Sequence, residues 1–259
     1  MTTIRALFGV ASRVTAKDFC AGLECEIENI ESIHERIENE GYWSITTDGS
    51  LRNNGREFIS KPLSKAKLLS EFDKLHNSLH YSTDEIADRF SARTSVHTHV
   101  NCLDLEDSQV KNIVLWYALF EPLFFLFAKP ERRNNIHCVG LDQTILSHQY
   151  SKSLKMLHSK WSKYTALNIV PLNKYGTIEF RHLEGTDDQE KIKAWLDTLE
   201  NLWAYGKTHE VNRMSVMNDA VVKEAFYAIF KDAPEIQKYS SILSKLLANS
   251  LVDIKLSLL

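Results

Sequence analysis

One alternating stretch decides the fold of this chain: Gly22-Leu23-Glu24-Cys25-Glu26-Ile27-Glu28. Successive side chains of a β-strand point to opposite faces of a sheet, so the apolar residues of this stretch share one face and its three glutamates share the other. Carboxylates held side by side repel one another, and a divalent cation is the usual reason for gathering them. The stretch therefore predicts a strand whose polar face either binds cations or is simply solvated.

A second strand with the same alternation is expected over Ser95–Leu103. Its polar face carries His97, His99 and Asn101, and its reverse face is apolar. Two histidines two residues apart on a strand are a reasonable pair of metal ligands, although a single histidine is more often a satisfied core residue.

A third strand is expected over Thr177–Leu183, with Glu179 and Arg181 on one face. A carboxylate that attracts metal beside an arginine that attracts anions suits a site for a metal and a phosphate. The same pair could equally be a cross-strand ion pair at the surface.

A hairpin is expected over residues 42–60, from a strand at Tyr42–Thr47 through a glycine-containing loop to a strand at Arg56–Ser60 that carries Glu57. Four separate segments thus offer metal or phosphate ligands on a single face. A curved sheet that collects these ligands on its concave side would explain all four together.

The remaining pattern predicts an α+β fold. Another strand is expected over Thr165–Val170, and helices are expected over Lys65–His80, Asp107–Ala128, Ser147–Lys163, Asp187–Gly206 and most of the chain from Asn218 onward. Since strands do not alternate strictly with helices, an antiparallel sheet fits better than a parallel one. The chain has no repeat or linker that divides it, so we expect a single domain with a helical carboxy-terminal region.

Composition restricts the class of protein. The 259 residues are 44% hydrophobic and 25% charged, with a net charge of -3, which predicts a soluble protein without the basic surplus that nucleic-acid binding favours. The longest apolar stretch, Ile113–Ala128, is shorter than the ~20 residues of a membrane span and contains Glu121 and Pro122, so we interpret it as a buried, kinked helix. The four cysteines form no CxxC pair, which favours reduced thiols in a cytoplasm.

The chain resembles the amidoligase family, which is related to glutamine synthetase and glutamate-cysteine ligase. The resemblance rests on five motifs in the family's order: GLECE (22–26), TDGSLRNNGREFISKPL (47–63), SVHTHVN (95–101), RRNNIHC (132–138) and GTIEFR (176–181). It covers about residues 22–202. It implies one amidoligase-like domain over residues 1–259, with the curved antiparallel sheet of the glutamine synthetase catalytic domain flanked by helices and a helical extension at about 203–259.

The resemblance also implies ATP and two Mg²⁺ (or Mn²⁺) ions held by the sheet. Carried over position by position, the expected metal ligands are Glu24, Glu26, Glu57, His97 and Glu179. The expected catalytic residues are Arg181, which would clasp the transferring phosphate, Glu57, and Asp48, which would help to seat the incoming amine. His99, Asn101 and Arg181 are expected at the nucleotide, and either Arg132 or Arg133 at a phosphate or substrate carboxylate. The chain departs from the family at Ser95-Val96, where a small residue and glycine often precede the first histidine.

The activity that the resemblance implies is ATP-dependent joining of a carboxylate to an amine through an acyl phosphate. Two alternatives are a zinc-dependent hydrolase that uses His97 and His99, and a binding or structural protein that keeps the fold without turnover. The expected substrates are amino acids, amines or peptides, with no nucleic-acid or membrane partner and with homo-oligomers as an option. The expected location is the cytoplasm of a bacterium, or of the host if a virus encodes the protein.

Overall fold

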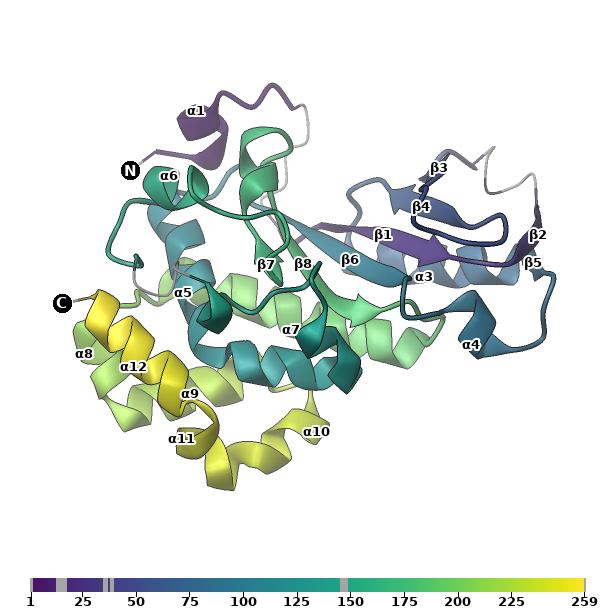
Figure 1. Ribbon diagram of the computed structural model, residues 1–259. Helices are drawn as coiled ribbons and strands as arrows, with labels where there is room; N and C mark the ends of the chain where they lie inside the picture. The colour runs from purple at the N-terminus through teal and green to yellow at the C-terminus, as the bar shows by residue number, and fades with distance from the viewer. Residues whose placement is uncertain (1, 13–17, 35–36, 38–39, 145–148, 259) are drawn as a thin grey trace.

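The computed structural model describes residues 2–12, 18–34, 37, 40–144 and 149–258. Its main sheet has six strands in the order β3-β4-β1-β6-β8-β7, and every neighbouring pair is antiparallel (Figure 1). The strands are β1 (Ala21–Ile27), β3 (Trp43–Thr46), β4 (Arg56–Ser60), β6 (Ser95–Asn101), β7 (Leu167–Asn168) and β8 (Thr177–Glu184), with β2 (Ile30–Ile33) and β5 (Leu79–Tyr81) forming a separate pair. The expected α+β class with an antiparallel sheet is confirmed.

The helices fall into two groups along the chain. The first group is α1 (Ile4–Phe8), α3 (Lys65–Asn77), α4 (Ile86–Arg89), α5 (Asp107–Phe124), α6 (Leu154–His158) and α7 (Gln189–Thr208). The second group is α8 (Arg213–Met217), α9 (Asp219–Ile229), α10 (Pro234–Gln237), α11 (Leu243–Leu246) and α12 (Ala248–Ser257). The expected helical carboxy-terminal region is present.

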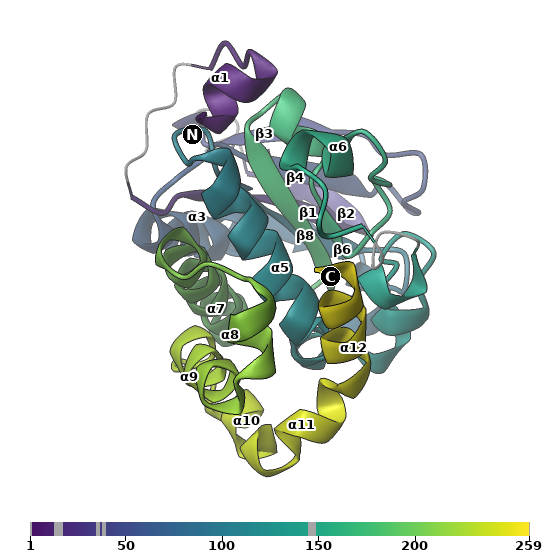
Figure 2. The ribbon, with the colours of Figure 1, turned by 90° about the vertical axis from the view of Figure 1, so that its left-hand side faces the viewer.

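The long helices cover one face of the sheet and leave the other for the polar side chains. Figure 1 shows α3 and α7 along the same side of the sheet, and α7 packs on both α3 and α5. The carboxy-terminal helices α9 and α12 contact α7 and α5, so they form an outer layer away from the sheet (Figure 2).

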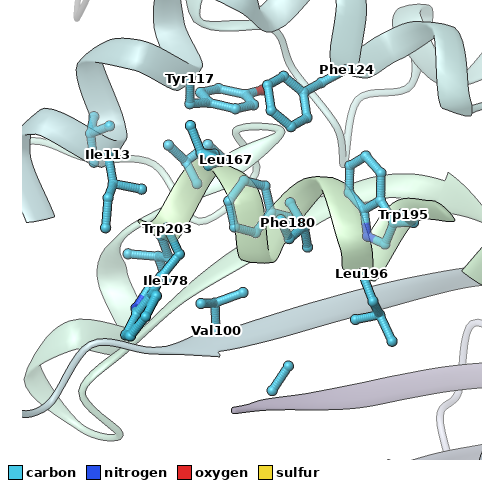
Figure 3. Packing of buried hydrophobic residues seen from close by; sticks show 14 of the residues in the cluster. Val100, Ile113, Tyr117, Phe124, Leu167, Ile178, Phe180, Trp195, Leu196 and Trp203 are labelled. Atoms are coloured by element: carbon cyan, nitrogen blue, oxygen red, sulfur yellow. The ribbon is translucent and has the colours of Figure 1, made fainter. Parts of the chain in front are cut away.

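Aromatic rings join the covered face to its helices. Figure 3 shows Phe180 of β8 among Tyr117 and Phe124 of α5 and Trp195 of α7, and the centroid of its ring lies 5.8, 6.4 and 6.1 Å from theirs. The Trp195 indole N–H also donates to Thr98 Oγ1 of β6 at 3.1 Å. Phe180 is fixed on the face that the helices cover. Its neighbours Glu179 and Arg181 are therefore held on the opposite face of the sheet.

The apolar helix α5 belongs to this core. Residues Asp107–Phe127 are long and apolar enough to cross a bilayer by length and composition alone, but 72% of their apolar 18-residue window is buried inside the protein. Pro122 lies in the last turn, where its missing N–H removes a helical hydrogen bond. The α-helix ends two residues later, at Phe124, and a 3-10 turn (Phe125–Phe127) follows.

Three predicted elements differ from the structure. The strand expected over Thr165–Val170 is present only as β7, Leu167–Asn168. The helix expected over Ser147–Lys163 is present only as α6, which begins after Ser153, whose hydroxyl accepts from the Met156 N–H; residues 147 and 148 lie outside the described residues. Serine side chains that bond to nearby backbone favour short capped turns over a long helix. The helix expected to reach His80 ends at Asn77, because the residues after it form β5 and pair with β2.

Candidate functional site

The register of the sheet brings the predicted polar residues together. Glu24 of β1 lies opposite His97 of β6, and His99 of β6 lies opposite Glu179 of β8. Because opposed residues of antiparallel strands point to the same face, three neighbouring strands place two carboxylates and two imidazoles on one patch.

The side-chain atoms of this patch converge closely. Nδ1 of His97 lies 3.3 Å from Oε2 of Glu24 and 3.4 Å from Oε1 of Glu179. Nε2 of His99 lies 3.1 Å from Oε1 of Glu24. Ligand atoms of Glu24, His99 and Glu179 all lie within 4.8 Å of one another. We call these four residues the carboxylate-histidine cluster.

The cluster is held in a partly buried, strongly charged setting. Burial opposes ionisation of Glu24, but hydrogen bonds with His97 and His99 outweigh it, so the pKa of Glu24 is lowered. Burial lowers the pKa of His99, but its hydrogen bond with the Glu24 carboxylate outweighs that effect and the net pKa is raised. Glu24 is therefore ionised at neutral pH, as a ligand for a hard cation must be.

Two further carboxylates lie beside the cluster. Glu26 of β1 is opposite Glu57 of β4, and Glu57 Oε2 accepts from the Thr46 hydroxyl at 3.0 Å. Burial raises the pKa of Glu57, and the nearby charges of Glu24 and Glu26 raise it further. Within the described part of the chain neither Glu26 nor Glu57 has an ion-pair partner, so like charges face each other across the two strands without compensation.

Arg181 borders the cluster on β8. Its Nη1 contacts Glu179 Oε1, and its Nε donates to the His137 carbonyl at 3.0 Å. The other Glu179 oxygen accepts from Asn168 Nδ2 at 2.6 Å, so both oxygens of that carboxylate are oriented. The guanidinium therefore places a permanent positive charge against a carboxylate of the cluster.

This donor set fits divalent cations of the hard type. Four glutamates and two histidines from four adjacent strands offer oxygen and imidazole ligands on one face. Oxygen-rich sets of this kind suit Mg²⁺ or Mn²⁺, and two cations would compensate the opposed carboxylates.

A cavity of about 370 Å³ opens beside the cluster. Gly22, which lies opposite His99 and has no side chain, leaves room there. The wall contains Glu24, His99, Asn101 and Thr177 together with Cys20, Leu23, Ile59, Pro62, Leu103, Lys174 and Tyr175. A mostly apolar wall with polar groups at one end is typical of a site for a small organic ligand.

Arg132 and Arg133 occupy different environments. Arg132 is only 6% exposed, and its Nε and Nη2 donate to the carbonyls of His182 and Arg181 at 3.0 and 2.6 Å. These carbonyls lie where the register between β6 and β8 shifts. Arg133 lies at the surface, 3.6 Å from Asp142. The hydrogen bonds that Arg132 donates therefore fix the backbone of β8 at Arg181 and His182.

Replacing Arg132 by methionine is expected to lower the free energy of unfolding by about 2–4 kcal/mol, because it leaves buried carbonyls without donors. Arg133→Met, at the neighbouring exposed position, should change it by less than about 0.5 kcal/mol. Urea unfolding of both variants measures the difference. Equal stability of the two variants, with turnover lost only in Arg132→Met, would instead favour direct binding of phosphate by Arg132.

Two acidic residues singled out in the sequence, Asp48 and Glu28, lie apart from the cluster. Asp48 is in the loop after β3, where its Oδ1 accepts from the Ser50 N–H at 2.7 Å, and the described residues show no contact between it and the cluster. Glu28 is fully buried and accepts from the backbone N–H and the guanidinium of Arg52 at 2.8 and 3.1 Å. The charge of Glu28 is therefore compensated by Arg52, and the residue has a structural role.

Several residues of the site were not predicted from the sequence. Ser95 and Asn168 contact predicted ligands directly, and Tyr175 and Lys174 line the cavity. Ser95 could have been found, because it lies two residues before His97 and so shares its face. Asn168 could not, because only the pairing of β7 with β8 brings it to Glu179.

Comparison with models of protein families finds a match. The model of a family described as "Putative amidoligase enzyme" matches residues 4–203, which include the whole six-stranded sheet. A search of curated proteins finds no match to this chain.

Proposed function

Because the chain belongs to the amidoligase family, we propose that it is an ATP-dependent carboxylate-amine ligase that uses two Mg²⁺ or Mn²⁺ ions. The observation that carries the proposal is the convergence of Glu24, His97 and Glu179 from three strands, beside Arg181. The fold we propose is the glutamine synthetase catalytic type, and the reaction is amide formation through an acyl phosphate.

Each set of carboxylates has a separate part in the proposal. The carboxylate-histidine cluster would hold the cation on the ATP phosphates, and Glu26 and Glu57 would hold the one nearer the substrate. These cations would neutralise charge on the transferring phosphoryl group. Arg181 would orient and neutralise the same group, because its guanidinium is fixed beside Glu179 by the His137 carbonyl.

The cavity beside His99 supports binding of the nucleotide. Its volume is within the range of small-molecule sites, and its apolar wall suits a base, while His99 and Glu24 lie at its polar end. The Tyr175 ring faces the His99 ring edge-on, with centroids 6.4 Å apart, and Lys174 Nζ lies 4.7 Å from the centre of the Tyr175 ring. A cation and an aromatic ring at the mouth would favour an anionic ligand that carries a planar group.

The proposal is tested by incubating the protein with ATP, Mg²⁺ and pools of amino acids, amines and small peptides. We expect ADP and phosphate to form only with a pool that contains both substrates, and mass spectrometry to find a product that has lost one water relative to their sum. Glu26→Gln should remove the signal, whereas Glu31→Gln, at an exposed position on β2, should keep it.

Two other results would contradict the proposal. Cleavage of a peptide in the pool without ATP, together with zinc retained in equal molar amount through purification, would favour the hydrolase alternative that uses His97 and His99. Tight binding of ATP without product from any pool would favour a binding protein.

A further inference from the structure

Gly22 is a glycine inside a strand, where a residue with a side chain is ordinarily more stable. It belongs to β1, lies opposite His99 of β6 and is buried. Glycine in a strand lowers stability, because it loses more freedom on folding than other residues and has no side chain to pack. Such a glycine is explained by an unusual backbone conformation, by a close neighbour in the protein, or by a ligand that approaches the backbone.

The protein itself does not require glycine at position 22. The φ angle of Gly22 lies outside the left-handed region, and a β carbon built there would lie 3.4 Å from the carbonyl oxygen and Oγ of Ser60, an ordinary van der Waals contact. Gly176, which precedes β8, differs in both respects. Its φ is +68°, and a β carbon there would lie 2.2 Å from Leu103 Cδ2. Gly176 therefore has a structural reason, whereas alanine would fit at Gly22.

The space in front of Gly22 is the cavity beside the cluster. Residues two apart in a strand point to the same face, so a side chain at position 22 would project beside Glu24, next to His99 of the neighbouring strand. Gly22, Glu24 and His99 all line the cavity, together with Ile59 of β4. A side chain at position 22 would therefore take up volume that a ligand could fill.

The spacing along β1 indicates which part of a nucleotide would lie there. A strand rises about 3.3 Å per residue, so the Cα atoms of Gly22 and Glu24 are about 6.6 Å apart. Glu24 is part of the cluster proposed to hold the cation on the ATP phosphates. Position 22 is thus one step away from the phosphates, toward the apolar part of the cavity. The ribose and base, rather than the phosphates, would face it.

We infer that Gly22 is a specificity-determining residue, at which the nucleoside portion of the bound nucleotide packs directly on the backbone of β1. The inference rests on the proposed function, since it names the residue that makes room for the nucleotide. It accounts for a glycine that neither the backbone conformation nor the packing of the protein requires. Affinity should therefore fall as the side chain at position 22 grows, but only for ligands that carry a nucleoside.

The test measures binding of ATP and of inorganic tripolyphosphate, each with Mn²⁺, by isothermal titration calorimetry. Tripolyphosphate carries the phosphates without the nucleoside. We expect Gly22→Ala to weaken ATP binding about 10-fold and Gly22→Leu more than about 100-fold, as is typical of carbon groups that a binding pocket must accommodate or exclude. Both variants should keep the affinity of the wild type for tripolyphosphate and for Mn²⁺ alone. Gly49→Ala, which adds a methyl group where no described atom lies within 4 Å, should bind ATP as the wild type does.

Urea unfolding separates a ligand-binding role of Gly22 from a structural one. Gly22→Ala removes the freedom of glycine from the unfolded chain at a position where alanine fits, so the midpoint of unfolding should rise. A lower midpoint together with weaker ATP binding would assign Gly22 a structural role and overturn the inference. Equal losses of affinity for ATP and tripolyphosphate, or wild-type affinity for ATP in Gly22→Ala, would also overturn it.

The two proposals fail in different ways. Absence of ATP binding by the wild type would contradict the proposed function and the role of Gly22 with it. ATP binding and turnover that are the same in the wild type and Gly22→Ala would leave the ligase proposal standing and remove the role of Gly22 alone.

Discussion

Arg181→Met is expected to lower ATP-dependent turnover by about 10³-fold while leaving Mn²⁺ affinity unchanged or slightly higher. An arginine that stabilises a transferring phosphoryl group contributes at least this much to turnover. The same arginine contacts Glu179, so its removal leaves that carboxylate more negative and no weaker as a metal ligand. Phosphate release under saturating substrates and Mn²⁺ titration measure the two effects on the same protein.

Arg181→Lys separates charge from geometry in this prediction. Lysine keeps the positive charge but cannot reproduce the planar fork that contacts both Glu179 and the His137 carbonyl. We expect turnover between those of the wild type and Arg181→Met. If Arg181 served only to orient Glu179, Arg181→Met would retain turnover within about tenfold and would lose Mn²⁺ affinity instead.

Local periodicity was sufficient to predict the ligand-bearing strands. β1, β4, β6 and β8 were expected within about two residues of their observed ends, because each alternates between apolar and polar side chains. The face on which each side chain lies was also predicted. Side chains alternate between the two faces of a strand, so once the apolar side chains pack on helices the polar ones must lie on the other face. In this way Glu24, His97 and Glu179 could be assigned to one patch before their strand order was known.

Other parts depend on contacts between distant segments. Arg132 or Arg133 of RRNNIHC was expected at a phosphate or substrate carboxylate, and only the register shift of β8 gives the donors of Arg132 the carbonyls of Arg181 and His182. Glu28 continues the alternation of β1, yet Arg52 compensates its charge within the hairpin. Such pairings depend on contacts between segments that are distant in the sequence, and the local alternation of residues does not predict these contacts.

Glu24→Gln is expected to abolish both cation binding and turnover, and so to differ from Arg181→Met. One Glu24 oxygen lies 3.1 Å from His99 and the other 3.3 Å from His97, so this carboxylate contacts both imidazoles of the cluster. The amide removes one negative charge and replaces one acceptor by a donor. Mn²⁺ affinity should fall by more than about 100-fold, because the change affects a ligand rather than a group that orients one.

Thermal unfolding with and without Mn²⁺ checks this loss independently of any substrate. At a Mn²⁺ concentration 100 times its dissociation constant, the wild type should gain about 2.7 kcal/mol over the protein treated with a chelator. With 100-fold weaker binding, the same concentration stabilises Glu24→Gln by only about 0.4 kcal/mol. For a protein of this length that difference corresponds to several degrees in Tm. The exposed control Glu31→Gln should keep the full response to Mn²⁺, and an equal response in Glu24→Gln would mean that the cation binds elsewhere.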